Sequence, residues 1–137
     1  MSTIALRPIG RVESRLTDPA KAPKQADEGA PEALLVIEPD FAAGLEGLKA
    51  GDEIILMTWL DRAQRDILVN HPRSDKSRPV AGVFTTRSPH RPNPIGLHQV
   101  TIADIDGPRV RVRSLEALDG TPILDIKGLL NPDIEQR

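Results

Sequence analysis

Two arginines, a histidine and an asparagine lie close together in the segment 82–97, which reads GVFTTRSPHRPNPIGL. Arg87, His90, Arg91 and Asn93 supply guanidinium, imidazole and amide groups, which bind anions and accept or donate protons. Three prolines in the same segment fix φ and push the preceding residues toward extended backbone. The segment therefore predicts a stiff loop that presents donors to an anion or ligand. The alternative is a solvated surface loop, the usual place for arginine.

The elements that must position this loop are strand-like. Apolar runs of β type flank it at 80–84 and 95–105, which places it at strand ends. Further runs of this kind lie at 4–12, 34–37, 53–60, 109–113 and after 120, whereas 42–50 is typical of one or two helical turns. Asp-Gly pairs at 106–107 and 119–120 are hairpin signals. We expect an all-β fold, a small β-barrel-like domain with one or two short helices and long loops.

Length and composition limit the class of protein. The chain has 137 residues, which predicts one domain spanning 1–137. It has no cysteine, and its three histidines lack metal-ligand spacing, so we expect neither disulfides nor a metal site. No G-x-G-x-x-G or Walker motif occurs, which argues against a Rossmann or P-loop fold. Without a membrane-spanning run or a secretory signal, the expected location is the cytoplasm and no membrane partner is predicted.

Charge is segregated along the chain although the net charge is only −2. The stretch 62–91, which we call the basic block, has seven basic residues (Arg62, Arg65, Arg73, Lys76, Arg78, Arg87 and Arg91) and only two acidic ones. Such a block indicates either a surface that faces RNA or phosphate, or a solvated loop. The residues alone leave both interpretations open.

The 82–97 segment contains the pattern FxTRSPxRPNPIG, which resembles the signature of the TsaA-like family, also called YaeB or TrmO. Blocks at 8–10, 44–51, 118–122 and 125–127 are similar to the family's other blocks and follow in the same order. The resemblance implies a non-Rossmann β-barrel that forms a homodimer, with S-adenosylmethionine bound near the subunit boundary. It also implies N6-methylation of threonylcarbamoyladenosine at position 37 of tRNA, with tRNA as the partner.

The resemblance also implies site residues. The implied cofactor contacts are Pro23, Gln25, Arg87, Leu97 and the four residues Glu116, Ala117, Leu118 and Asp119. In chemical terms Arg87 suits the cofactor carboxylate, and an acidic side chain suits ribose hydroxyls or the ammonium group.

Methyl transfer needs close positioning of the acceptor and removal of its proton. We assign positioning to Arg91 and Asn93, and the proton to His90 or Asp125.

Three positions depart from the family pattern: Lys24 replaces an arginine, Asp61 a histidine, and Gly128-Leu129 a Pro-Tyr pair. Two other functions remain open. One is a methyltransferase with the same cofactor and a small-molecule acceptor or another RNA position. The other is a non-enzymatic regulatory module that binds S-adenosylmethionine.

Overall fold

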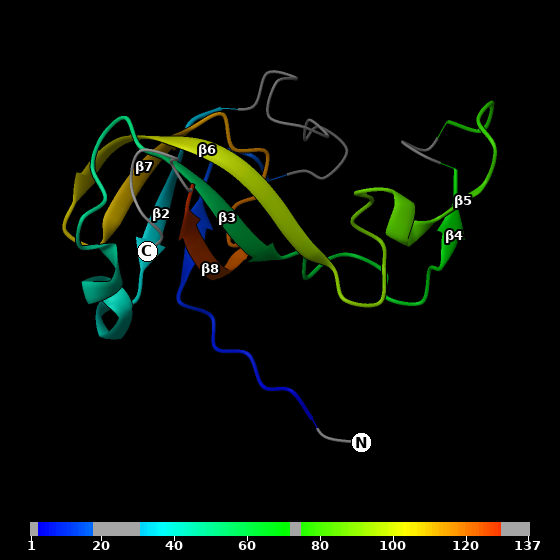
Figure 1. Ribbon diagram of the computed structural model, residues 1–137, viewed down its shortest axis with the longest axis horizontal. Coiled ribbons are helices and arrows are strands. Elements are labelled where there is room, and N and C mark those ends of the chain that lie inside the picture. Colours follow the sequence, from blue (N-terminus) through cyan, green and yellow to red (C-terminus); the bar gives the residue numbers. More distant parts are fainter. Residues whose placement is uncertain (1–2, 18–30, 72–74, 130–137) are drawn as a thin grey trace.

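The protein is a closed barrel of six antiparallel strands in the order β1-β2-β7-β6-β3-β8 (Figure 1). The computed structural model describes residues 3–17, 31–71 and 75–129. The barrel strands are β1 (Gly10–Glu13), β2 (Ala33–Ile37), β3 (Glu53–Trp59), β6 (Ile95–Asp106), β7 (Arg109–Arg113) and β8 (Pro122–Gly128). The prediction of an all-β, barrel-like fold with little helix is confirmed. Closure of the sheet leaves these strands without a free edge.

The barrel core follows from the two-residue period of its strands. Residues that alternate along each strand point inward, so that Ile54 of β3 lies opposite Val100 of β6 and Leu56 lies opposite His98. The buried apolar cluster is built from Val, Ile, Leu and Ala. The strand expected at 109–113 forms as β7, in which Val110 and Val112 are buried between exposed arginines. Aliphatic side chains therefore stabilise the barrel with almost no aromatic contribution.

Two strand predictions were too long. The early strand begins at Gly10 rather than at residue 4, because the register of β1 with β2 starts at the pair Gly10 and Ile37. The run at 80–84 has only β4 (Val69–Asn70) to pair with, so it forms the two-residue β5 (Ala81–Gly82) and then a 3-10 turn, η5 (Val83–Thr85).

The helical turns expected at 42–50 form earlier, as the 3-10 helix η3 (Pro39–Leu45). In the described ranges, no helix has the length and apolar character needed to cross a bilayer.

Three connections leave the barrel at the same end. Because neighbouring strands are antiparallel, β1, β3 and β7 all run toward this end, and β2, β6 and β8 start there. The connections are 14–32, 60–94 and 114–121. The second is an excursion that holds β4, β5 and η5 beside the barrel (Figure 1). We call this the site end of the barrel, since it gathers nearly all residues with candidate chemistry.

Gly10 lets β1 and β2 approach closely. A Cβ at this position would lie 2.3 Å from the backbone oxygen of Val36, and neither group can move without changing the register. Gly44 in η3 is a suitable contrast, because a Cβ there would meet nothing within 4 Å.

We expect Gly10→Ala to lower the free energy of unfolding by about 2 kcal/mol or more, as overpacking against backbone does. Gly44→Ala is the matched control and changes it by less than about 0.5 kcal/mol. Urea titration followed by circular dichroism measures both. Equal stability of the two variants would contradict the β1–β2 register.

Candidate functional site

The 82–97 loop is fastened to the start of the excursion by a ladder of hydrogen bonds. The N–H of Leu60 donates to the oxygen of Pro94 at 2.8 Å, and the N–H of Arg91 donates to the oxygen of Gln64 at 3.1 Å. The Arg65 guanidinium donates to the oxygen of Pro92 at 2.7 Å and stacks over Trp59, 5.0 Å from the ring centroid. The stiffness predicted from the prolines is thus supplemented by bonds from a second segment.

Arg91 binds the loop's own backbone. Its guanidinium donates to the carbonyl oxygens of Ser88 at 2.7 Å, Val83 at 2.6 Å and Thr86 at 2.5 Å. These bonds reinforce the η5 turn, which the N–H of Thr86 closes by donating to the oxygen of Val83 at 3.2 Å. A role for Arg91 in positioning a methyl acceptor stays a prediction. In the structure, its side chain stabilises the conformation of the loop.

His90 and Asn93 are also held by this ladder. The Nδ1 atom of His90 accepts the N–H of Gln64 at 3.0 Å, and Asn93 Oδ1 accepts from Arg65 Nη2 at 3.1 Å. Because Nδ1 is an acceptor, Nε2 is the imidazole atom that remains for other chemistry. His90 lines a hollow of about 250 Å³ together with His71 and five other residues of the excursion.

Leu97 and Asp125 lie on the outer surface of the barrel. Met57 of β3 pairs with Leu97 of β6 on one side and with Asp125 of β8 on the other, so the three are neighbours in one row. Asp125 forms an ion pair at 3.2 Å with Lys127, two residues further along β8. Arg87 is exposed in the loop and makes no hydrogen bond or ion pair with another described residue.

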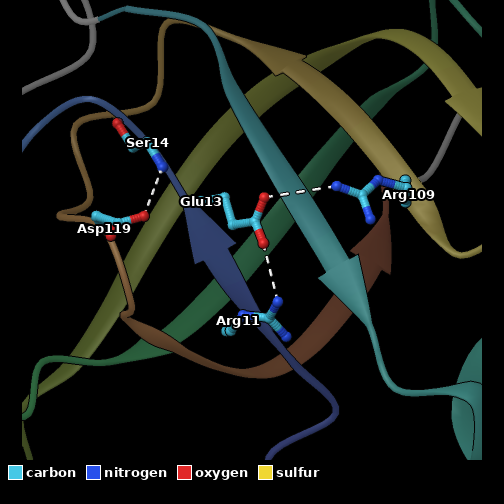
Figure 2. A network of polar contacts seen from close by, with 5 residues as sticks. All are labelled: Arg11, Glu13, Ser14, Arg109 and Asp119. Atoms are coloured by element: carbon cyan, nitrogen blue, oxygen red, sulfur yellow. Dashed lines mark hydrogen bonds and ion pairs between the residues drawn. The ribbon is translucent and has the colours of Figure 1, made fainter.

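The 114–121 connection is fixed to both ends of the 14–32 connection. The N–H of Leu115 donates to the oxygen of Pro31, and the N–H of Asp119 donates to that of Leu16. Asp119 Oδ1 in turn accepts the N–H of Ser14 at 2.9 Å (Figure 2). Asp119 therefore belongs to a rigid part of the site end.

An open hollow of about 590 Å³ adjoins Asp119. Its walls come from β1, β2, β7 and the Asp119–Gly120 turn, and they include the Glu13 carboxylate, which lies between Arg11 at 2.8 Å and Arg109 at 3.6 Å (Figure 2). A hollow of this volume suits a ligand of nucleoside size. Arg87 and Leu97 do not line it.

A buried polar network closes the inside of the barrel at the site end. Thr58 Oγ1 lies 2.7 Å from His98 Nε2, and His98 Nδ1 lies 2.5 Å from Glu116 Oε1. Thr58 is fully buried and His98 is 6% exposed. The other carboxylate oxygen of Glu116, Oε2, is buried and has no hydrogen-bond partner in the described part of the chain. A buried acceptor without a donor costs free energy and calls for a physical explanation.

Gly96 makes room for this network. A Cβ at Gly96 would lie 2.4 Å from Thr58 Oγ1 and 2.7 Å from His98 Nε2. The glycine that ends the PNPIG motif is therefore needed because the Thr58 and His98 side chains lie close to it, and not because the backbone turns there. A register shift between Met57 and Thr58 in the β3–β8 pairing adds a bulge at the same place, as bulges near functional sites do.

Sequence reasoning missed Thr58 and His98. The signal was present, because both lie on the alternating positions that carry the apolar core of β3 and β6. A histidine or threonine on a buried strand face must find a polar partner, so each predicts a second polar residue nearby. Glu116 was predicted as a cofactor contact, and its partner in the barrel was not.

Two predicted site residues, Pro23 and Gln25, lie outside the described residues, as does the departure at Lys24. Within the described ranges, no group of three histidine, aspartate or glutamate residues is placed to hold a metal ion.

The fold and site define a small closed β-barrel protein with a polar site at one open end, built from three connections and distinct from a Rossmann nucleotide-binding domain. Residues 11–132 match the family described as the tRNA-methyltransferase O N-terminal domain. The chain belongs to this family, as the motif at 82–97 indicated.

Relatives extend this finding. An S-adenosyl-L-methionine-binding protein of Archaeoglobus fulgidus is 42% identical over 131 residues, which cover 95% of this chain and 91% of the relative. A second protein of that organism, described as a probable S-adenosyl-L-methionine-binding protein, is 42% identical over 93% of this chain. The crystal structure of TrmO from Pseudomonas aeruginosa is 31% identical over 94% of this chain, with a TM-score of 0.73. The chain spans only 34% of the second relative and 57% of the crystallised TrmO chain.

We expect Arg91→Ala to loosen the 82–97 loop, because the side chain gives up hydrogen bonds to three carbonyl oxygens of that loop. Hydrogen exchange measured by mass spectrometry should rise across 83–91. Arg87→Ala is the matched control, since it removes the same charge from the same loop and leaves exchange unchanged. Equal exchange in both variants would contradict the clamp role of Arg91.

Proposed function

We propose that this protein is an S-adenosylmethionine-dependent methyltransferase that acts on tRNA, with N6 of threonylcarbamoyladenosine 37 as the acceptor. The observation that carries the proposal is the convergence at the site end. The described residues that the family resemblance assigns to the cofactor all come from the connections at this end or from the start of β6. Membership of the family and the names of the relatives supply the ligand and the reaction class.

The residues present fit the cofactor chemically. S-adenosylmethionine carries a carboxylate, an ammonium group and ribose hydroxyls, and supplies an activated methyl group on a sulfonium. Arg87 is an exposed cation suited to the carboxylate. Glu116 has a buried oxygen without a donor, and Asp119 is held in place by Ser14, so both suit hydroxyl or ammonium donors.

The chain's own residues have two tasks in methyl transfer, namely orientation and proton removal. The ladder around 82–97 holds its polar groups in one geometry, which is the main requirement for an in-line displacement. His90 accepts the N–H of Gln64 at Nδ1, so Nε2 carries the proton of the neutral imidazole, and His90 takes up a further proton only at Nδ1, after release of that bond. Asp125 is the second candidate acceptor, although Lys127 pairs with one of its oxygens.

The excursion is the proposed surface for tRNA. Its arginines at 65 and 91 bond to backbone carbonyl oxygens, which leaves their positive charges unneutralised. Asp75 offsets part of this charge, since hydrogen bonds from Ser77 lower the pKa of its carboxyl, and it pairs with Arg78 at 3.5 Å. The remaining positive charge suits a phosphate backbone, and a tRNA substrate implies a cytoplasmic protein.

A homodimer with the cofactor near the subunit boundary is part of the proposal. The excursion exposes large apolar side chains: Leu68, Val69, Val80 and Phe84, the last 79% exposed. Ile95 and Leu97, on the outer face of β6, are exposed as well. Exposed apolar side chains concentrated in this way favour a protein interface. Since Leu97 is also a predicted cofactor contact, such an interface would adjoin the cofactor.

We expect transfer of labelled methyl groups from S-adenosylmethionine to total tRNA and not to tRNA that lacks threonylcarbamoyladenosine. A metabolite extract serves as the third acceptor. Label in the extract alone would favour a small-molecule methyltransferase, and binding of the cofactor without any transfer would favour a regulatory module. Arg87→Ala should weaken cofactor binding about 10-fold or more, because it removes a charge-assisted bond.

We expect Phe84→Glu to weaken the dimer at least 10-fold in sedimentation velocity, because it buries a charge in the interface. Ile4→Glu is the control, since Ile4 is equally exposed but lies on the N-terminal arm outside the excursion. A monomeric wild type, or equal dissociation of both variants, would contradict an interface formed by the excursion.

A further inference from the structure

The donors and acceptors of the Thr58–His98–Glu116 network follow from the requirement that each buried donor has an acceptor. Thr58 Oγ1 has one polar side-chain partner in the described residues, His98 Nε2. If Nε2 carried a proton, it would donate to Oγ1, and the buried Thr58 hydroxyl would lack an acceptor. The arrangement that satisfies every donor has Thr58 O–H donating to Nε2 and His98 Nδ1–H donating to Glu116 Oε1. Glu116 Oε2 is then left over without a donor among the described residues.

A hydroxyl, an imidazole and a carboxylate in this order also occur in hydrolases with a nucleophilic serine or threonine. That interpretation fails here, because Thr58 is fully buried inside the barrel and its oxygen cannot reach a substrate. The end of the network that a ligand can reach is instead Glu116. Of the three side chains, only Glu116 lies on a connection at the site end, and its side chain is 16% exposed.

The network joins the two parts of the proposed cofactor site. His98 directly follows Leu97, and Glu116 begins the 116–119 segment, so their hydrogen bond ties the start of β6 to the 114–121 connection. Gly96 maintains the space that this bond requires. An unpaired carboxylate oxygen persists in a folded protein when the surrounding structure holds it there for another purpose.

We propose that Thr58 and His98 are positioning residues, which hold the carboxylate of Glu116 as an oriented acceptor whose Oε2 receives a hydroxyl or ammonium donor of the cofactor. This inference rests on the proposed function, since it names the residues that receive one part of S-adenosylmethionine. The last torsion of a glutamate is broad, so the carboxylate can tilt toward a donor while Oε1 keeps its bond to His98.

The decisive variant is Glu116→Gln, which has nearly the same shape. The glutamine oxygen still accepts from His98, but its amide N–H₂ takes the place of Oε2. The amide then faces the hydroxyl or ammonium group of the cofactor, and two donors cannot form a hydrogen bond with each other. We expect cofactor affinity, measured by isothermal titration calorimetry, to fall about 10- to 100-fold, as for loss of a bond to a charged group. We expect the resistance to urea to be unchanged or higher, because a buried unpaired anion is removed.

The source of the donor is distinguished by two cofactor analogues, one without the amino group and one without the ribose hydroxyls. For the analogue that lacks the group bound by Glu116, wild type and Glu116→Gln should have the same affinity. For the other analogue, Glu116→Gln should still bind more weakly than wild type. If the variant weakens both analogues equally, Glu116 has a structural role only and the proposal is overturned.

Matched pairs test the positioning residues. His98→Asn keeps a donor near the place of Nδ1 and should bind within about threefold of wild type, whereas His98→Leu should bind about 10-fold more weakly. Thr58→Ser keeps the hydroxyl and should bind as wild type, whereas Thr58→Val should bind a few-fold more weakly.

Failure of this inference differs from failure of the proposed function. Wild-type protein that does not bind S-adenosylmethionine contradicts the function itself. Wild-type protein that binds it, together with unchanged affinity in Glu116→Gln and His98→Leu, contradicts only the role of the network.

Discussion

The hydrogen bond between His98 and Glu116 is the interaction on which the site end of the barrel depends. It joins the start of β6, which directly follows the proline-rich loop, to the connection between β7 and β8. Thr58 holds the far side of the imidazole, and Gly96 provides the space. A hydrogen bond to a charged group contributes about 1.5–3 kcal/mol, and the buried, unpaired Oε2 of Glu116 offsets part of that gain.

The closed barrel supplies the second constraint. The six antiparallel strands have three connections at one end and two at the other, and the candidate site residues gather at the end with three, where β6 begins. The proline-rich loop lacks a sheet of its own apart from β4 and β5, so Arg91, Arg65 and their carbonyl partners maintain its shape. Much of the cationic character of the motif thus has a structural role, which leaves the exposed Arg87 as the arginine suited to bind a ligand.

Much of the fold could be predicted from the sequence, because the apolar run at 95–105, the strand-like run at 109–113 and the Asp-Gly turn between them are local signals. The strand at 80–84 could not, since its length depends on a partner that the two-residue β4 cannot provide. Motif resemblance identified Glu116 but not His98 or Thr58. Their importance depends on the register of β3 and β6, which pairs Thr58 with Gly96. This register depends on how the whole barrel closes, so local sequence patterns do not predict it.

A crystal structure of the protein with S-adenosylmethionine bound tests the central claim most directly. The account predicts that the cofactor lies at the site end, with one of its hydroxyl or ammonium groups within hydrogen-bond distance of Glu116 Oε2 and the His98–Glu116 bond intact. A cofactor bound elsewhere on the barrel, or one at the site end while Oε2 stays without a donor, would contradict it.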